Sequence, residues 1–303
     1  MDVLEALRLV PGFEGVTRAD AITRLGGLTN LVHRVDIGER SVIVRIPGAG
    51  TEDYIDRAVE AHNAQAAARA GVSPEVLLAD PVTGLMVTRT VPGIETMTPA
   101  SFKSRKGSPA RAGKALAKLH RSGERFDFRF ELFAKIDEYL DVLATRDVDL
   151  PEGYHAVVAA AEPVKAALAR ANPPLAPCHC DPLCENFLDD GAVMWIVDWE
   201  YSGMNDPLWD LGDLSVEGGF DAAQDEEMLR AYFGAEPGAG DRGRMVIYKA
   251  MCDLLWTLWG LIQLANGNPA DDFRAYADTR FARCKALMAD PAFAGHVAAV
   301  RAG

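Results

Sequence analysis

The chain has 303 residues, of which 49% are hydrophobic and 25% are charged, and its formal net charge is −13 at pH 7. This composition is typical of a globular protein with a substantial core and argues against a disordered chain. The acidic charge and the lack of a Lys/Arg-rich block argue against nucleic acid as the main partner.

The first 92 residues predict a small lobe of strands and one helix. Two runs with strand-like alternation, 31–37 and 41–46, flank a turn signal at 38–40 and predict a β-hairpin. The glycine turn GGLTN, residues 26–30, precedes this hairpin. We therefore expect a glycine loop that opens directly into a pair of strands.

An Ala-rich helix is predicted after the hairpin, within residues 51–71, and it is expected to end at its last glycine. A second pair of strands is predicted at 74–80 and 84–90. The Val-Pro-Gly segment at 91–93 then interrupts the pattern. We place the end of the N-terminal lobe within this tripeptide, at residue 92.

Helices dominate the remaining residues, 93–303, which predict a second lobe. The segments with helical periodicity are 109–121, 131–145, 153–171, 225–233, 244–266 and 270–288. Only FLDD and VMWIVDWE, residues 187–190 and 193–200, look extended, and the Asp-Gly step between them favours a hairpin turn. The stretch 234–243 is expected to be a loop. The sequence thus predicts an α+β fold with a small β-rich lobe and a larger, mainly helical lobe.

The stretch HCDPLCENFL, residues 179–188, carries the first candidate chemistry. Asp181 lies in a loop, and Asn186 lies five positions later, just before the predicted hairpin. Asp198 lies across that hairpin, so it can approach Asn186. Amide and carboxylate oxygens are ligands that Mg²⁺ prefers. An Asp that handles a hydroxyl proton, followed by an Asn and a second Asp on the metal, is how kinase-type phosphoryl transfer is assembled.

Taken singly, each of these three residues is better explained as a turn cap or a surface carboxylate. The spacing HxDxxxxN also occurs by chance, but the apolar strand and the Asp that follow it favour a function in catalysis.

Charged residues of the N-terminal lobe support the same interpretation. Arg45 ends the second strand, where a kinase-like lobe needs a cation directed at the nucleotide phosphates. Glu60 in the following helix can hold this guanidinium, and Glu52 is the rival partner. Two solvated charges on an exposed edge are the alternative. The backbone N–H groups of GGLTN can approach phosphate closely.

Four stretches resemble the choline/ethanolamine kinases, within the wider group of aminoglycoside-phosphotransferase-like kinases, and together they span nearly the whole chain. They are GGLTNLVHRV, VIVRIPG, HCDPLCEN and IVDWEYSGMNDPLWDLGDLSVE. The last is the most specific, because it carries Glu200, Tyr201, Asn205 and Asp210 at the family's spacing. The resemblance implies a protein-kinase-like fold and transfer of the ATP γ-phosphoryl group to choline, giving phosphocholine.

The resemblance also implies roles for individual residues. Asp181 is expected to be the base, and Asn186 and Asp198 are expected to hold Mg²⁺. The residues expected around ATP are Gly26, Gly27, Thr29, Asn30, Arg45 and Glu60, with Thr88, Arg89, Thr90 and Val91 at the adenine hinge. The residues expected around the acceptor are Asp181, Glu200, Tyr201, Glu217, Trp256 and Trp259. Cys180 and Cys184 occupy variable positions of the catalytic loop and are expected to be inert.

Trp256 and Trp259 are three residues apart, so they share one face of a helix whose aliphatic residues gather on another side. Such a pair is more often part of a core. With the family resemblance, we interpret the indoles as walls of a cation site, since an aromatic face attracts a quaternary ammonium by roughly 0.5 to 2 kcal/mol. Choline, which has no N–H donors on its ammonium, fits aromatic walls better than ethanolamine.

Several other functions remain open on the sequence alone. Ethanolamine, thiamine or an aminoglycoside could be the acceptor. Cys178, His179, Cys180 and Cys184 could bind a metal, although their spacing is too cramped for an ordinary zinc site. A catalytically inactive binding module is the third alternative, which the filled reactive positions argue against.

The sequence also bears on location and partners. It shows no secretory signal, and its most apolar run, 254–262, is shorter than the roughly 20 residues that span a bilayer. Five unevenly spaced cysteines do not resemble a disulfide framework. We expect a cytoplasmic enzyme with reduced thiols, a small-molecule substrate and no membrane partner, and we keep a homodimer among the assemblies considered.

Overall fold

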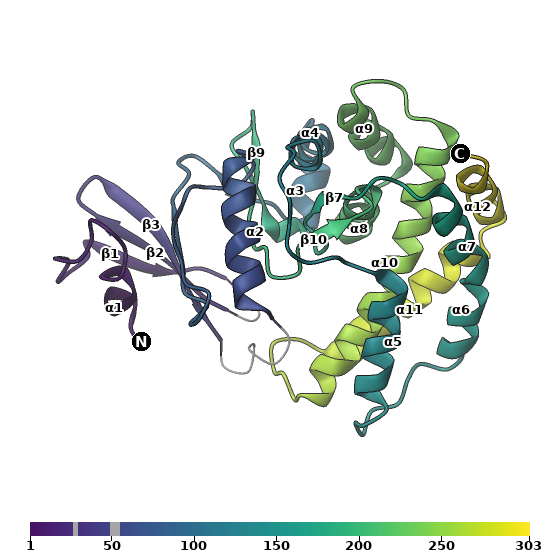
Figure 1. Cartoon of the computed structure of the whole chain (residues 1–303), viewed down its shortest axis with the longest axis horizontal. Coiled ribbons are helices and arrows are strands. Elements are labelled where there is room, and N and C mark those ends of the chain that lie inside the picture. Colours follow the sequence, from purple (N-terminus) through teal and green to yellow (C-terminus); the bar gives the residue numbers. More distant parts are fainter. Residues whose placement is uncertain (27–29, 49–54) are drawn as a thin grey trace.

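The computed structural model describes residues 1–26, 30–48 and 55–303, and it places an antiparallel sheet at the N-terminal end and a larger helical region beyond it (Figure 1). The sheet has five strands in the order β1-β2-β3-β5-β4. These strands are β1 (Ala21–Arg24), β2 (Asn30–Ile37), β3 (Arg40–Pro47), β4 (Val76–Ala79) and β5 (Met86–Arg89). The two-lobed α+β fold is confirmed, and the boundary at residue 92 stays a prediction.

The hairpin of β2 and β3 aims Arg45 at the rest of the molecule. Val42 and Val44 of β3 are buried in a small core with Leu7 of helix α1 (Val3–Leu7). Because successive side chains of a strand point to opposite faces, Arg45 projects from the other face. There it forms an ion pair with Glu60 of helix α2 (Arg57–Arg69).

Helix α2 begins at Arg57, because the side chain of Asp56 caps it by accepting hydrogen bonds from two backbone N–H groups of the first turn. Gly71, just beyond the end of the helix, has a φ of +69°, which ends a helix at little cost only in glycine. The helix predicted within 51–71 is therefore confirmed among the described residues, with a later start. It lies between the sheet and the helical region (Figure 1).

The helical region is organised around α10 (Ala239–Ala265), which packs against helices on several sides. The other helices are α3 (Pro99–Ser104), α4 (Ser108–His120), α5 (Leu132–Leu143), α6 (Tyr154–Ala160), α7 (Glu162–Ala171), α8 (Leu208–Gly218), α9 (Ala222–Phe233), α11 (Phe273–Ala289) and α12 (Phe293–Ala302). By length and composition α10 matches a membrane span, but 78% of its apolar stretch is buried inside the fold. Its apolar character is that of a core helix.

Two predicted boundaries in this region are wrong. The helix expected at 153–171 is divided into α6 and α7 at Ala161, because Pro163 in the first turn of α7 has no N–H to continue the hydrogen-bond ladder. The loop expected at 234–243 is shorter, since α10 already begins at Ala239. Asp241 accepts a hydrogen bond from the Gly238 N–H at 3.1 Å, which satisfies a group at the start of the helix.

The hairpin expected after the catalytic stretch is present as β8 (Phe187–Asp189) and β9 (Met194–Ile196), with β6 (Glu95–Thr96) added at its edge. A further pair, β7 (Ala176–Cys178) and β10 (Gly203–Asn205), was not predicted from the sequence. These short sheets lie between α2 and the helical core (Figure 1). They hold the loops that carry the candidate site.

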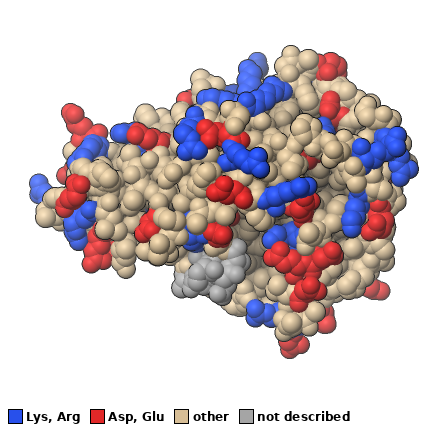
Figure 2. All heavy atoms as spheres, viewed as in Figure 1, with Lys and Arg blue, Asp and Glu red and all other residues tan. Residues whose placement is uncertain are grey.

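On the face drawn in Figure 2, basic and acidic side chains are interspersed and no continuous basic surface is visible. This distribution agrees with the net charge of −13.

Candidate active site

Asp210 of α8 anchors the loop that carries the candidate base. Its buried carboxylate accepts hydrogen bonds from the backbone N–H of His179 at 2.7 Å and of Cys180 at 2.9 Å. The Nε2 atom of His120 also lies 2.9 Å from this carboxylate. Three donors on one buried carboxylate fix the backbone immediately before Asp181.

His179 connects the same loop to Val197, the residue that follows β9. Its Nε2 atom lies 2.8 Å from the carbonyl oxygen of Val197, and its Nδ1 atom lies 3.3 Å from the backbone N–H of Asp181. Burial lowers the pKa of His179, which keeps the ring neutral. A neutral ring can donate from Nε2 and accept at Nδ1, so both contacts are satisfied.

Asp181 and Asn186 are held together at the two ends of their loop. Asn186 closes the short 3₁₀ helix η2 (Cys184–Asn186), and its Nδ2 donates to the carbonyl oxygen of Asp181 at 3.1 Å. This bond leaves the amide oxygen of Asn186 available for a ligand. Among the described residues, no hydrogen bond to the Asp181 carboxylate is found, so it too can contact a substrate.

The electrostatic surroundings of Asp181 make its carboxylate a stronger proton acceptor. Burial raises its pKa well above the usual range, and the negative charges of Glu217, Asp198 and Glu200 raise it further, while Arg280 acts in the opposite direction. A carboxylate with a raised pKa is a stronger base than an ordinary aspartate.

Asp198 lies just after β9, at the open end of the hairpin. The Val197 N–H donates to the Asn186 carbonyl oxygen at 3.0 Å, which brings the two predicted metal ligands to the same end. Asp198 has a φ of +69° and Cys180 a φ of +67°, a conformation that is costly for residues other than glycine. Such strained residues are concentrated at functional sites, and both lie in the predicted catalytic segments.

The oxygens of Glu60, Asp198 and Glu200 lie within 4.8 Å of one another. Arg45 joins this group through its ion pair with Glu60 and a 2.9 Å contact with Asp198. The predicted Arg45–Glu60 pair is therefore present, and the rival Glu52 lies outside the described residues. This set of carboxylate oxygens fits the hard-oxygen chemistry of Mg²⁺.

Glu200, which was expected beside the acceptor, contacts polar residues of the N-terminal lobe. It accepts a hydrogen bond from Asn30 at 3.2 Å and lies 3.7 Å from Arg57. Burial, with the negative charge of Asp198, raises the pKa of Glu200 to about 8. Arg57, which also pairs with Glu60 at 2.7 Å, was missed from the sequence.

The aromatic residues expected around the acceptor are in contact. Trp256 and Trp259 meet edge to face with ring centroids 6.5 Å apart, and Tyr201 lies 5.8 Å from Trp256. The indole N–H of Trp259 donates to the Tyr201 hydroxyl at 3.1 Å. Phe273 and Tyr276 of α11 also contact the Trp259 ring and extend this aromatic group.

Charged residues behind the aromatic group were not predicted, apart from Glu217. Glu217 forms an ion pair with Arg280, whose guanidinium stacks over the Tyr276 ring at 4.4 Å. Arg280 also contacts the buried Asp253 at 3.3 Å. The i, i+4 spacing of Tyr276 and Arg280 on one helix was the available sequence signal.

The residues expected at the adenine hinge lie on and after β5. Arg89 pairs with Glu75 at the surface, and the backbone N–H of Thr90 donates to Ser41 at 3.2 Å. Gly26 and Asn30 are the first and last residues of the GGLTN stretch, and Gly27 and Thr29 lie outside the described residues.

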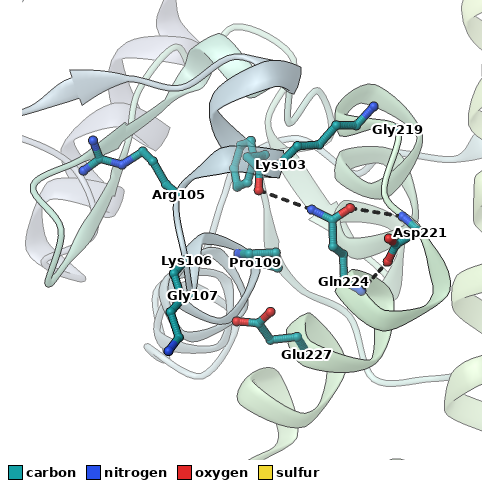
Figure 3. A pocket seen from close by; sticks show the side chains of 10 residues that line it. Lys103, Arg105, Lys106, Gly107, Pro109, Gly219, Asp221, Gln224 and Glu227 are labelled. Atoms are coloured by element: carbon teal, nitrogen blue, oxygen red, sulfur yellow. Dashed lines mark hydrogen bonds between the residues drawn. The ribbon is translucent and has the colours of Figure 1, made fainter.

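A surface pocket of about 540 Å³ lies apart from all predicted site residues (Figure 3). The residues that line it are Phe102, Lys103, Arg105, Lys106, Gly107, Pro109, Gly219, Asp221, Gln224 and Glu227. In Figure 3, Gln224 is hydrogen-bonded to the Phe102 carbonyl and to the backbone of Asp221, so its amide is engaged in joining α9 to α3.

Residues 21–247, well over half of the chain, match the model of the phosphotransferase enzyme family, APH. The chain belongs to this family. A choline/ethanolamine kinase family protein from Mesorhizobium loti is 65% identical, with a TM-score of 0.90 and coverage of 99% of this chain and 98% of that one. Family membership confirms the predicted type of enzyme.

Two structures of LicA are also similar to this chain. Choline kinase LicA from Streptococcus pneumoniae is 27% identical, with a TM-score of 0.77 and coverage of 90% and 94% of the two chains. A structure of LicA in complex with AMP is 26% identical, with a TM-score of 0.74 and coverage of 92% and 93%. The chain is thus a nucleotide-binding phosphotransferase of the choline/ethanolamine kinase family, acting on an alcohol group of a small molecule.

Proposed function

We propose that this enzyme is a choline kinase, which transfers the γ-phosphoryl group of ATP to the hydroxyl of choline. One observation carries the proposal: Tyr201, which contacts both indoles of the Trp256–Trp259 pair, lies three residues after Asp198. Tyr201 thus joins the aromatic group of α10 to the short segment that carries the predicted metal ligand. Such an aromatic group can hold the trimethylammonium of choline while the choline hydroxyl faces the reactive groups.

In this mechanism Asp181 orients the choline hydroxyl and accepts its proton as the oxygen attacks the phosphorus in line. Its open carboxylate and raised pKa support this role. Asn186 and Asp198 would hold Mg²⁺, which, when bound, neutralises charge on the phosphate oxygens. Arg45 supplies a guanidinium to the phosphates and is kept in place by Glu60.

Choline is favoured over ethanolamine because the indole N–H groups are already hydrogen-bonded within the protein. Trp256 donates to Asp213 at 3.1 Å and Trp259 donates to Tyr201 at 3.1 Å, so the rings are fixed as walls. A trimethylammonium gains from such walls without needing hydrogen-bond acceptors. A primary ammonium needs acceptors for its N–H groups, and Glu217 is already paired with Arg280.

The test is steady-state ATP consumption with choline, ethanolamine, other amino alcohols, thiamine and aminoglycosides, each with Mg²⁺. We expect the highest kcat/KM with choline, and excess choline should inhibit turnover of each alternative. The Asp181→Asn variant is expected to lose activity by about a thousandfold or more while remaining folded. A higher kcat/KM for ethanolamine, thiamine or an aminoglycoside would overturn the choice of choline, and full activity in the variant would overturn the role of Asp181.

A further inference from the structure

Asp213 is a buried carboxyl group that the proposed mechanism does not use. It lies on α8 one helical turn before Glu217 and has no exposed surface. One oxygen, Oδ2, accepts the indole N–H of Trp256 at 3.1 Å. The other oxygen, Oδ1, is buried and has no hydrogen-bond partner among the described residues. An unpaired buried oxygen of this kind is costly and indicates that a ligand or a proton completes it.

The charges around Asp213 do not balance if it is ionised. Asp181 and Glu217 act on it with negative charge, and Arg280 is the cation that opposes them. Arg280 is already paired with Glu217, and it shares Asp253 with Arg283, which lies 2.5 Å from that carboxylate. A buried charge without its own partner is strongly unfavourable, and an ionised Asp213 would have no cation of its own to pair with.

Groups from four segments face Asp213. They are Glu217 on its own helix, Cys180 and Asp181 of the catalytic loop, Cys252 and Trp256 of α10, and Tyr276 and Arg280 of α11. Burial raises the pKa of both thiols and of Tyr276, so these groups carry no charge near neutral pH. Arg280 remains the cation of this set.

We propose that Asp213 holds a proton in the free enzyme and releases it when a cationic acceptor occupies the site beside Trp256 and Glu217. In this step the O–H bond of the Asp213 carboxyl group breaks, the proton passes to solvent, and the carboxylate stays as a counter-charge to the ammonium. The inference rests on the proposed function, because it takes a cationic amino alcohol as the acceptor. It makes Asp213 a residue that couples acceptor affinity to pH.

The direction of the shift at Asp213 agrees with this geometry. Burial raises its pKa well above the usual range, and the charges of Glu217 and Asp181 add to the rise. A bound cation favours the ionised form, so binding releases a proton and acceptor affinity increases with pH. The dissociation constant is expected to fall by up to about tenfold per pH unit below the pKa of the free enzyme.

Isothermal titration calorimetry of choline binding to the whole enzyme tests the inference. Choline has a permanent charge and no titratable group near neutral pH, so any released proton comes from the protein. The number of protons follows from the heat measured in buffers with different ionisation enthalpies. We expect wild-type enzyme to release a substantial fraction of about one proton per choline bound.

Two variants assign the proton. Asp213→Asn keeps an oxygen for the Trp256 N–H, so it is expected to bind choline with almost no proton release and with a pH-independent dissociation constant. Glu185→Gln is the matched carboxyl-to-amide control, because Glu185 is exposed in η2. It is expected to keep the wild-type proton count.

Each outcome separates the inference from the proposed function. Choline binding to wild-type enzyme without proton release, across the neutral range, overturns the role of Asp213 even if Asp213→Asn does not fold. Unchanged proton release in Asp213→Asn, or loss of proton release in Glu185→Gln, assigns the proton to another group and also overturns the role of Asp213. If neither binding nor turnover of choline is found, the proposed function itself fails.

Discussion

Replacing Asp210 with Asn tests whether this buried carboxylate sets the position of the catalytic loop. Its two oxygens receive the N–H groups of His179 and Cys180 and lie near Nε2 of His120, at 2.7 to 2.9 Å. Asn has the same shape but only one acceptor oxygen, and its NH₂ group would face a donor. At least one backbone N–H next to Asp181 would therefore lose its partner.

The magnitude follows from these contacts. A hydrogen bond to a charged group contributes about 1.5 to 3 kcal/mol, and an unpaired buried donor costs about 1 to 3 kcal/mol. Because these terms overlap, Asp210→Asn is expected to lower the free energy of unfolding by about 2 to 4 kcal/mol. At roughly 2 °C per kcal/mol for a chain of this size, the melting temperature should fall by about 4 to 8 °C.

Thermal unfolding and steady-state kinetics of the same preparation provide the assay. We expect kcat to fall by about tenfold or more, since small displacements of a reacting group are costly, with little change in nucleotide binding. Asp190→Asn is the matched control, because Asp190 also accepts two backbone N–H groups, at 2.8 and 2.6 Å, but is exposed to water. Asp210→Asn with the melting temperature and kcat of that control would refute the anchoring role.

Three further predictions concern the reactive groups. The raised pKa of Asp181 means that its carboxylate form, which is the base, is lost as pH falls, so kcat/KM should decline. This decline should occur at a higher pH than it would for an ordinary aspartate. A value of kcat/KM that stays constant down to pH values near 4 would contradict this prediction. Trp259→Leu should raise the KM for choline by about 3- to 30-fold and that for ethanolamine less, measured in parallel; equal losses would exclude the aromatic cation site. Chelation with EDTA should abolish turnover without changing the circular dichroism spectrum, and added Mg²⁺ should restore it; activity that survives chelation would exclude Asn186 and Asp198 as ligands of an essential metal.

The parts of the fold that follow local rules were predictable from the sequence. The β2–β3 hairpin follows from alternation around a turn, and the β8–β9 hairpin from its Asp-Gly step. Periodicity alone predicted one continuous helix where Pro163 interrupts the hydrogen-bond ladder and divides it into α6 and α7. Helix α8 was not predicted, because its segment was interpreted as a family signature and it is buried on nearly all sides, so its hydrophobic pattern has no polar face.

The candidate site was predictable where neighbouring residues in the sequence carry the chemistry, as for Asp181 and Asn186. The site was less predictable where segments that are far apart in the sequence meet. The pairing of Glu200 with Asn30 joins the two lobes across 170 positions, and that of Arg280 with Glu217 joins α11 to α8. No spacing rule encodes such contacts, because they depend on how the helices pack.

The most direct test of the account is identification of the product. Wild-type enzyme incubated with ATP, Mg²⁺ and choline should yield phosphocholine and ADP in equal amounts, measured by phosphorus NMR and mass spectrometry, and Asp181→Asn should yield neither. Release of inorganic phosphate without phosphocholine, or phosphorylation of a different acceptor in a mixture that contains choline in excess, would contradict the proposed function.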